Sequence, residues 1–405
     1  MKKFKMSMYP IQVKKWVLKH GQLVNPSNAI KTPVVYLVSS IHKEQALEKI
    51  ITNIGKDAPV YLVEFPIGNN ENLSFSDLAK ILSLYLDQVG VSKVHIMAFG
   101  FESFIAHSFA SNYPERIGKL MVGGIVENVR ESNRLILQEG LNSYFRGEKE
   151  HFVTSVLLNF FNFGQREKVS RSEDLISSLN DKMSNSDEDI TYLKENIERY
   201  LEFEGLERSP FCETLIMAGE YDRFTTPYES FSVAKRIPKA EFVIVNHADH
   251  LGVIQMQDVY SRLVRRFLTD KPLNRMKDVE VFERTTYPVE KIRMEPRFEL
   301  NDVAFLDSGN GVFVPINIVD INKYGCKLYT SFKDHQSVQG ENKFYLHFPK
   351  ENWKVELFLF EKSGEGHFRA VFRHCDWDST QSFESYVDTI GHGQLGENHQ
   401  KDQAA

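Results

Sequence analysis

The chain has 405 residues, of which 42% are apolar and 26% charged, and its formal net charge is −6. This composition excludes a disordered chain, and the negative charge gives no overall attraction to nucleic acid or to anionic membranes. The length predicts two to three domains. Three cysteines without metal-binding spacing (Cys212, Cys326 and Cys375) predict a reducing compartment and no metal site. No apolar run reaches transmembrane length and the first residues lack the apolar core of a signal peptide, so we expect a cytoplasmic protein without a membrane span.

The first 130 residues follow the pattern of an α/β protein. Short, wholly apolar runs predict the buried strands of a parallel sheet, and helical spacing separates them. Alternating residues at the start of the chain predict an antiparallel edge hairpin that turns at His20-Gly21. The expected elements are the hairpin at 10–23, strands at 32–39, 59–65, 94–97 and 119–122, and helices at 42–53, 74–89 and 101–111. This order predicts a right-handed, doubly wound sheet.

A tight turn of small and aromatic residues, Ala98-Phe99-Gly100-Phe101-Glu102, joins the strand at 94–97 to the following helix. It resembles the nucleophile elbow of the α/β-hydrolase family, G-x-S-x-G, and the Tyr113-Pro114-Glu115-Arg116 segment after the helix extends the resemblance. Gly100 stands at the serine position, and Ala98 and Glu102 stand at the glycine positions. Glycine retains the strained turn but supplies no nucleophile, so no acyl-enzyme can form there in the usual way. The alternative is a plain strand-to-helix corner.

The loop after the strand at 32–39 reads Ser39-Ser40-Ile41 where the family has His-Gly, so one oxyanion-hole element is also altered. Residues 128–209 contain no convincing strand and resemble the helical lid of the same family. The lid carries an apolar stripe made of Phe152, Val156, Leu157, Phe160 and Phe161. These residues form either the core of a helix bundle or the lining of a pocket for an acyl chain or another apolar ligand.

The sheet is expected to resume with strands at 213–218 and 241–245, followed by a closing helix at 255–268. Between them, Asp222 lies in a G-x-x-D-x-x-T-T-P pattern that resembles the loop of the family's acidic triad member. His250, preferred over His247, takes the position of the catalytic histidine. The resemblance therefore assigns the three positions of the family's catalytic triad to Gly100, Asp222 and His250. An Asp–His pair can still orient a water or accept a proton, so an enzyme that acts without a serine remains an alternative.

Residues 1–270 are thus assigned to an α/β-hydrolase-like domain and residues 271–288 to a linker. Six basic residues crowd the end of the domain and the linker, a pattern typical of a solvated face: Arg262, Arg265, Arg266, Lys271, Arg275 and Lys277. After the linker, six short segments of strand-like periodicity predict a small antiparallel barrel over residues 289–390. The tail, 391–405, is rich in Gly, Gln, Asn and His and is expected to be disordered.

The barrel resembles the PilZ domain, a bacterial receptor module for cyclic di-GMP, on two motifs. The R-x-x-x-R motif is present as Arg293-Met294-Glu295-Pro296-Arg297, just before the first strand. The D/N-x-S-x-x-G motif is present as Asp320-Ile321-Asn322-Lys323-Tyr324-Gly325, with Asn322 in place of serine.

This resemblance implies a site at which Arg293 and Arg297 bind phosphate or guanine with their planar guanidinium groups, while Asp320 and Asn322 hydrogen-bond to guanine edges and Gly325 permits the turn. It implies a ligand, cyclic di-GMP, and no cofactor. It also implies a bacterial effector in motility or biofilm control whose hydrolase-like domain binds a protein partner or an apolar ligand. The alternative for the barrel is a protein-contact surface that has lost the ligand.

Overall fold

The computed structural model divides the chain into two compact units. Unit 1 comprises Met1–Val129 and Phe160–Ile292, and unit 2 comprises Arg130–Asn159 and Arg293–Ala405. The structure describes residues 6–13, 16–23, 30–38, 48–65, 73–165, 167–169, 178–181, 183–206, 208–283, 297–307, 313–330, 343–348, 353–362 and 366–404. The sequence places the whole helical insertion with the hydrolase-like domain, whereas the structure groups its first part with the barrel.

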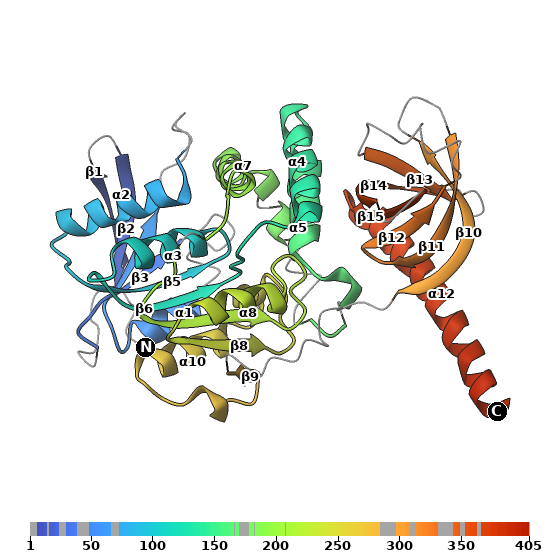
Figure 1. Cartoon of the computed structure of the whole chain (residues 1–405). Helices are drawn as coiled ribbons and strands as arrows, with labels where there is room; N and C mark the ends of the chain where they lie inside the picture. The colour runs from blue at the N-terminus through green and yellow to red at the C-terminus, as the bar shows by residue number, and fades with distance from the viewer. Residues whose placement is uncertain are drawn as a thin grey trace. The chain divides into compact units, whose positions relative to one another are not determined.

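Unit 1 is built on one sheet of nine strands in the order β1-β2-β4-β3-β5-β6-β7-β8-β9 (Figure 1). The six strands from β4 to β8 in this order run parallel, and the β1–β2 hairpin and β9 pair antiparallel at the two edges. The strands are β1 (Met6–Val13), β2 (Trp16–Leu23), β3 (Val34–Leu37), β4 (Val60–Glu64), β5 (Val94–Phe99), β6 (Ile117–Gly123), β7 (Glu213–Gly219), β8 (Ala240–Val245) and β9 (Val279–Phe282). This confirms the predicted, mostly parallel α/β sheet.

Helices cover both faces of this sheet because the chain reverses its direction of travel across it. The step from β3 to β4 goes one way across the sheet, and the steps from β4 to β5 and from β5 to β6 go the other way. Right-handed crossovers therefore put α1 on one face of the sheet, and α2 and α3 on the other. Accordingly α2 packs beside α3, and α1 beside α10 (Figure 1). The helices are α1 (Glu48–Ile54), α2 (Phe75–Gln88), α3 (Glu102–Asn112), α7 (Asp187–Leu201), α8 (Pro227–Arg236), α9 (Gly252–Gln255) and α10 (Gln257–Leu268).

Local sequence explains several of these boundaries. Ser74 caps α2 in a capping box with Asp77, and Thr226 does the same for α8 with Glu229. The residues of β3 and β5 are buried without exception, which is why both strands read as continuous apolar runs rather than as an alternating pattern.

Two boundaries differ from the expectation. His20 and Gly21 lie inside β2, paired with Tyr9 and Met8, so the hairpin does not turn there. The expected linker contains η3 (Leu273–Arg275) and β9, which pairs with β8 through Val245 and Val279. Pairing with β8 covers an otherwise open sheet edge, a long-range effect that the four-residue Val-Glu-Val-Phe run does not announce by itself.

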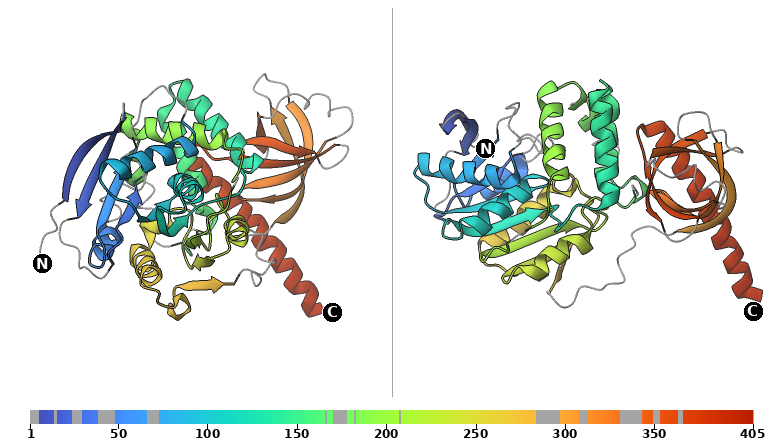
Figure 2. Two further views of the ribbon diagram at one scale, coloured as in Figure 1. Left: turned by 60° about the vertical axis from the view of Figure 1, so that its left-hand side comes forward. Right: turned by 45° about the horizontal axis from the view of Figure 1, so that its top comes forward.

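Unit 2 contains a closed barrel of six antiparallel strands in the order β10-β11-β12-β15-β14-β13, which confirms the predicted barrel (the right-hand view of Figure 2). The strands are β10 (Phe298–Asp307), β11 (Phe313–Asn322), β12 (Gly325–Tyr329), β13 (Lys343–Phe348), β14 (Trp353–Lys362) and β15 (His367–Arg373). Alternate residues of β11 and β13 point inward, so one apolar cluster fills the barrel.

A helix follows the barrel strands. Helix α12 runs from Trp377 to Ala404, so the structure has helix where the sequence predicts a disordered tail from residue 391 onward. Its residues Phe383 and Val387 are fully buried in the barrel core, and Tyr386 and Ile390 pack against it. This i, i+3, i+4, i+7 spacing is the helical signal that the polar composition of the tail obscures.

The first two helices of the insertion, α4 (Glu131–Phe145) and α5 (Lys149–Phe160), begin in unit 2, where α4 packs on β14. The contact is made by charged side chains. Lys343 Nζ lies 2.6 Å from Glu139 Oε1 and 3.3 Å from Glu356 Oε2, while Arg373 binds Glu356 at 2.9 Å and Ser143 Oγ at 3.0 Å. Arg373 and Glu356 are almost entirely buried. A buried network of this kind holds α4 firmly to the barrel strands.

Candidate functional site

Three of the predicted site positions meet at the carboxyl ends of neighbouring strands of unit 1. Gly100 follows β5, Asp222 follows β7 and His250 follows β8. The sheet reverses its winding between β3 and β5, and the carboxyl edge beside such a reversal is where open α/β sheets bind their ligands. Position in the fold therefore favours this edge as the candidate site.

Asp222 and His250 form a buried hydrogen-bonded pair. Asp222 Oδ2 lies 2.9 Å from His250 Nδ1, and the two side chains are 3% and 6% exposed. The other carboxylate oxygen of Asp222 accepts the backbone N–H groups of Phe224 and Thr225, at 2.9 and 2.8 Å. The hydroxyl of Thr225 donates to Asp222 Oδ2 at 2.7 Å and lies 3.1 Å from His250 Nδ1. The carboxylate is thus held in place to fix the ring of His250.

His247, the alternative histidine, lies elsewhere. It adopts a left-handed backbone conformation with φ of 59°, and its Nδ1 is 3.1 Å from the carbonyl oxygen of Lys168. The structure therefore brings His250, and not His247, to Asp222.

Gly100 has φ of 64°, the left-handed conformation that a nucleophile elbow imposes and that glycine adopts without strain. Its N–H donates to the carbonyl oxygen of Gly123 at 2.9 Å. A Cβ atom added at the neighbouring Gly124 would lie 2.9 Å from His250 Cε1 and 3.4 Å from Gly100 Cα. The imidazole and the turn therefore approach the same point, and Gly124 leaves the space between them open.

Aromatic rings enclose His250. The rings of Phe160 and Phe224 lie 4.8 and 4.9 Å from the imidazole, and 4.7 Å from each other. Tyr200 and Phe101 continue the cluster, with centroids 5.4 Å apart. Phe160 is 1% exposed and Phe224 2%, so a substrate would have to displace these rings to reach the imidazole.

The apolar stripe of the insertion is buried throughout. Its five residues are at most 1% exposed. Burial of this degree is what the bundle-core interpretation requires, and Phe160 also contributes to the ring cluster around His250.

Glu102, at the second glycine position of the elbow, is an unusual buried acid. It is 1% exposed, its Oε1 accepts the Tyr192 hydroxyl at 2.8 Å, and its Oε2 has no hydrogen-bond partner among the described residues. Burial raises the pKa of Glu102 from 4.5 to about 7, against the opposing hydrogen bond from Tyr192. The carboxyl is therefore largely protonated below neutral pH.

This burial predicts a pH-dependent stability. Because the native state holds the Glu102 proton between pH 4.5 and 7 and the unfolded state does not, the free energy of unfolding should fall over that window as pH rises. The shift corresponds to roughly 3 kcal/mol. The Glu102→Gln variant retains a hydrogen-bond acceptor for Tyr192 but cannot titrate. Its free energy of unfolding, measured with urea, should therefore not show this fall between pH 4.5 and 7. The exposed Glu115→Gln variant is the control and should follow wild type, and an equal slope in all three proteins would contradict the assignment.

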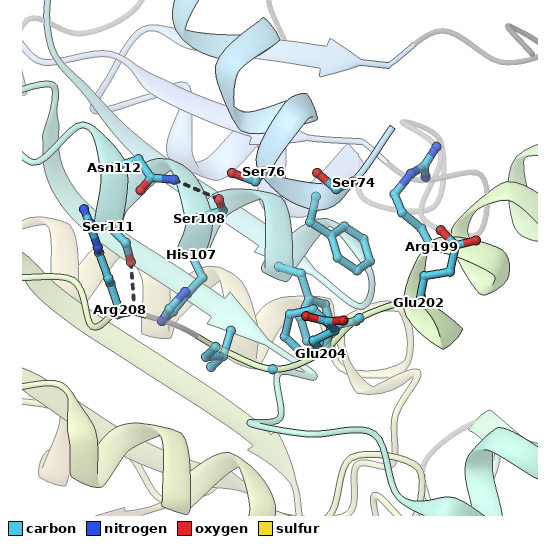
Figure 3. A pocket seen from close by; sticks show the side chains of 15 residues that line it. Ser74, Ser76, His107, Ser108, Ser111, Asn112, Arg199, Glu202, Glu204 and Arg208 are labelled. Atoms are coloured by element: carbon cyan, nitrogen blue, oxygen red, sulfur yellow. Dashed lines mark hydrogen bonds between the residues drawn. The ribbon is translucent and has the colours of Figure 1, made fainter. Parts of the chain in front are cut away.

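A cavity of about 320 Å³ lies along α2, α3 and the end of α7 (Figure 3). Its apolar lining includes Phe75, Phe104 and Phe203, whose rings contact one another at 5.1 and 4.9 Å. Its polar rim includes Ser74, Arg199 and the buried His107, and burial lowers the pKa of His107 to about 4. Aromatic rings, hydroxyls and a neutral imidazole beside the charged Arg199 suit an amphipathic ligand.

In unit 2, Arg297 immediately precedes β10 and forms an ion pair with Asp320 on β11. Both side chains are partly exposed, 30% and 25%. The pair therefore stands at the barrel surface, where the guanidinium group is accessible to a ligand. Arg293, the other arginine of the motif, lies outside the described residues, as does the Ser39-Ser40-Ile41 segment.

Asn322 and Gly325 shape the turn between β11 and β12. Asn322 Oδ1 accepts the backbone N–H groups of Tyr324 and Gly325, at 3.0 and 2.9 Å, and so closes an Asx turn. A Cβ atom at Gly325 would lie 2.3 Å from the carbonyl oxygen of Ala370 on β15. The glycine is therefore required by the close approach of β15, and not by the backbone angle of the turn.

Sequence reasoning missed three contributors to these sites. Thr225 could have been found from the D-x-x-T spacing after Asp222, because a threonine three residues after an aspartate commonly hydrogen-bonds to it. Tyr192 and Gly124 gave no sequence signal, since their importance arises from contacts with residues far away along the chain.

Two further searches bear on ligands and membranes. The described residues hold no group of three or more His, Cys, Asp or Glu side chains arranged to bind a metal ion. Within the same part of the chain, no helix combines the length and apolar composition that crossing a membrane requires.

Comparison with known proteins addresses unit 1. Residues 55–256 match the family model described as alpha/beta hydrolase fold. A 2-hydroxy-6-oxononadienedioate/2-hydroxy-6-oxononatrienedioate hydrolase from Escherichia coli is 24% identical over 211 residues, which cover 48% of this chain and 69% of that protein. The Pseudomonas putida hydrolase 1 of the same name is 25% identical over 203 residues, 48% of this chain and 70% of the relative.

Solved structures agree on the fold. An alpha/beta hydrolase enzyme, MGS-M2, from a Medee basin deep-sea metagenome library superposes with a TM-score of 0.53 at 14% identity, covering 66% of this chain and 98% of its own. The enol-lactonase from Burkholderia xenovorans LB400 gives 0.53 at 16% identity, covering 64% and 100%. At such identities the likeness concerns the fold. The chain thus carries an α/β-hydrolase fold domain, matched over residues 55–256, followed by a six-stranded antiparallel β-barrel.

Proposed function

We propose that the protein is a cyclic di-GMP receptor in which a PilZ-like barrel controls a hydrolase-fold domain that has lost its nucleophile. The observation that carries the proposal is the pair of Arg297 and Asp320 on the surface of a closed six-stranded barrel. Arginine at this position offers a planar donor fork to phosphate or to the O6 and N7 acceptors of guanine. The carboxylate of Asp320 orients the guanidinium group before the ligand arrives.

The other motif residues have defined roles in this proposal. The Oδ1 atom of Asn322 is used by its own turn, which leaves its amide nitrogen to donate to a guanine edge. Arg293, four residues before Arg297, supplies the second guanidinium group. Calorimetric titration with cyclic di-GMP tests the proposal directly: we expect micromolar or tighter binding, and well-folded protein that does not bind would refute it.

Control of the hydrolase-fold domain would pass through the helical insertion. The ion pair between Glu139 and Lys343, and the hydrogen bond that Arg373 donates to Ser143, make α4 move with the barrel. Helix α5, which follows directly, ends at Phe160, whose ring contacts His250. Ligand binding to the barrel would thereby reach the aromatic cover of the candidate site, to an extent no greater than the ligand's differential affinity for the two arrangements.

This coupling predicts a change in the average arrangement of the two units. We expect small-angle X-ray scattering to show a change in the radius of gyration when cyclic di-GMP is added to wild-type protein, because the ligand would draw Arg293, in the chain segment before β10, onto the barrel beside Arg297. Arg297→Ala, titrated in parallel, should give no change. Superimposable curves for wild type with and without bound ligand would contradict the switch, but not the binding itself.

For the hydrolase-fold domain we propose a non-enzymatic output, a surface or pocket for a protein partner or an apolar ligand such as that of Figure 3. The second candidate is an enzyme that acts through Asp222 and His250 without a covalent intermediate. The intact 2.9 Å hydrogen bond between the two side chains favours it, since that geometry equips the imidazole to accept a proton.

Restoring a hydroxyl at the elbow separates these candidates. We expect Gly100→Ser to gain slow turnover of p-nitrophenyl acetate, about 10²-fold or more above wild type, because His250 already faces that point of the turn. Gly100→Ala adds the same Cβ without the oxygen and should stay inactive. If the double variant Gly100→Ser/His250→Ala loses the esterase activity that Gly100→Ser gains, that activity depends on the imidazole of His250. Wild-type turnover that depends on His250 would instead support the enzyme.

A further inference from the structure

Unit 1 has a second pocket, of about 550 Å³, on a part of the surface unrelated to either site described above. Its lining contains six basic residues and two carboxylates, those of Asp57 and Asp278. The basic residues are Arg262, Arg265, Arg266, Lys271, Arg275 and Lys277. The sequence alone assigned this run to a solvated face, whereas the fold gathers it around one cavity.

Three of these cations have roles in the fold. Arg265 Nε lies 2.5 Å from Asp57, and Arg262 Nη2 lies 2.7 Å from Asp278. Arg266 donates twice to the carbonyl oxygen of Pro272, at 2.9 and 2.6 Å. Arg265 and Arg266 also lie in the last turn of α10, where positive charge is favoured by the helix dipole. Structural needs therefore account for the three arginines of α10.

The remaining three cations, Lys271, Arg275 and Lys277, have no such explanation. They lie beyond the helix, are exposed, and form no ion pair with another residue in the described part of the chain. Six positive charges against two negative ones leave an excess of four in a protein whose net charge is −6. Charges of one sign gathered in a concave site repel each other and attract an anion.

We propose that this pocket binds a phosphate ester, either as a free phosphorylated small molecule or as a lipid headgroup. Arginine can engage a phosphate through two parallel N–H donors, and lysine adds a mobile point charge. The fixed guanidinium group of Arg266 would form the base of the site, with the three cations beyond the helix as its adjustable rim. None of these residues belongs to the Arg297–Asp320 pair or to the Asp222–His250 pair, so the site is independent of both.

The test removes the unpaired charges only. The triple variant Lys271→Gln/Arg275→Gln/Lys277→Gln leaves the ion pairs of α10 intact. The matched control Lys80→Gln/Lys93→Gln/Lys239→Gln changes the net charge by the same amount at exposed positions elsewhere on unit 1. Both are made in full-length protein that also carries Arg297→Ala, which removes the barrel as a competing anion site. The probes are inorganic pyrophosphate, by calorimetry, and phosphatidylglycerol vesicles compared with phosphatidylcholine vesicles, by co-sedimentation.

We expect the parent protein to bind a phosphate probe with an affinity that falls as salt is raised. The triple variant should bind it about tenfold more weakly, and the control like the parent. Binding of pyrophosphate alone favours a free phosphorylated small molecule as the ligand, whereas binding of the anionic vesicles alone favours a lipid headgroup. Absence of binding to both probes, or equal weakening in the triple variant and its control, overturns the proposal.

Discussion

Arg297→Ala should abolish most of the binding of cyclic di-GMP, with a loss of at least about 100-fold in affinity. The guanidinium group supplies charge-assisted hydrogen bonds that alanine cannot replace, and the substitution leaves the carboxylate of Asp320 facing an anionic ligand. Calorimetric titration of the variant beside wild type measures the loss. Since both side chains of the pair are partly exposed, the variant should keep the wild-type melting temperature.

Lys354→Ala is the control for this experiment. Lys354 is also a barrel cation, but it lies on β14 over the ring of Tyr345, whereas Asp320 lies on β11. It should bind like wild type. If Arg297→Ala and Lys354→Ala weaken binding equally, the ligand responds to the overall charge of the barrel, and the motif is not the site.

Glu356→Ala should be among the most destabilising single substitutions in unit 2, by about 3–5 kcal/mol. Glu356 is the cross-strand partner of Arg373, whose side chain is 3% exposed, and it also lies 3.3 Å from Lys343. Alanine would leave the guanidinium group buried without a counter-charge. Urea unfolding followed by fluorescence reports on unit 2, because two of the three tryptophans, Trp353 and Trp377, belong to it.

Glu148→Ala is the control, because it removes a carboxylate of the same kind from an exposed ion pair with Arg146 between α4 and α5. It should leave the unfolding midpoint unchanged. Glu356→Gln, which keeps an acceptor without the charge, should fall between wild type and alanine. A Glu356→Ala variant as stable as Glu148→Ala would mean that water reaches Arg373 and that the network does not hold α4 to the barrel.

The basic pocket and the barrel pair would place two anion sites on one chain. The barrel pair combines an arginine with a carboxylate, which suits a ligand that has both phosphates and hydrogen-bonding base edges. The lining of the pocket on unit 1 has an excess of positive charge, so the proposed site would select mainly for negative charge. The two sites are therefore expected to differ in salt dependence, with the pocket the more sensitive.

The sequence by itself determined the fold class and the approximate position of most elements. Buried parallel strands such as β3 and β5 require continuous apolar runs, the β11 and β13 barrel strands require alternation, and Ser74 and Thr226 mark helix starts through local capping. Gly100, Asp222 and His250 were available as candidates because turn chemistry and their order along the chain are local properties.

The tertiary structure decided everything that depends on contacts between distant segments. The sequence already favoured His250 over His247, but only the structure shows its 2.9 Å hydrogen bond to Asp222, 28 residues away. Gly325 is required because the carbonyl group of Ala370, in another strand, lies where a Cβ atom would be. The raised pKa of Glu102 is caused by burial. The grouping of α4 with the barrel depends on ion pairs such as that between Glu139 and Lys343, 204 residues apart. Local patterns carry no information on such pairs, because hydrogen bonds, desolvation and packing act between neighbours in space.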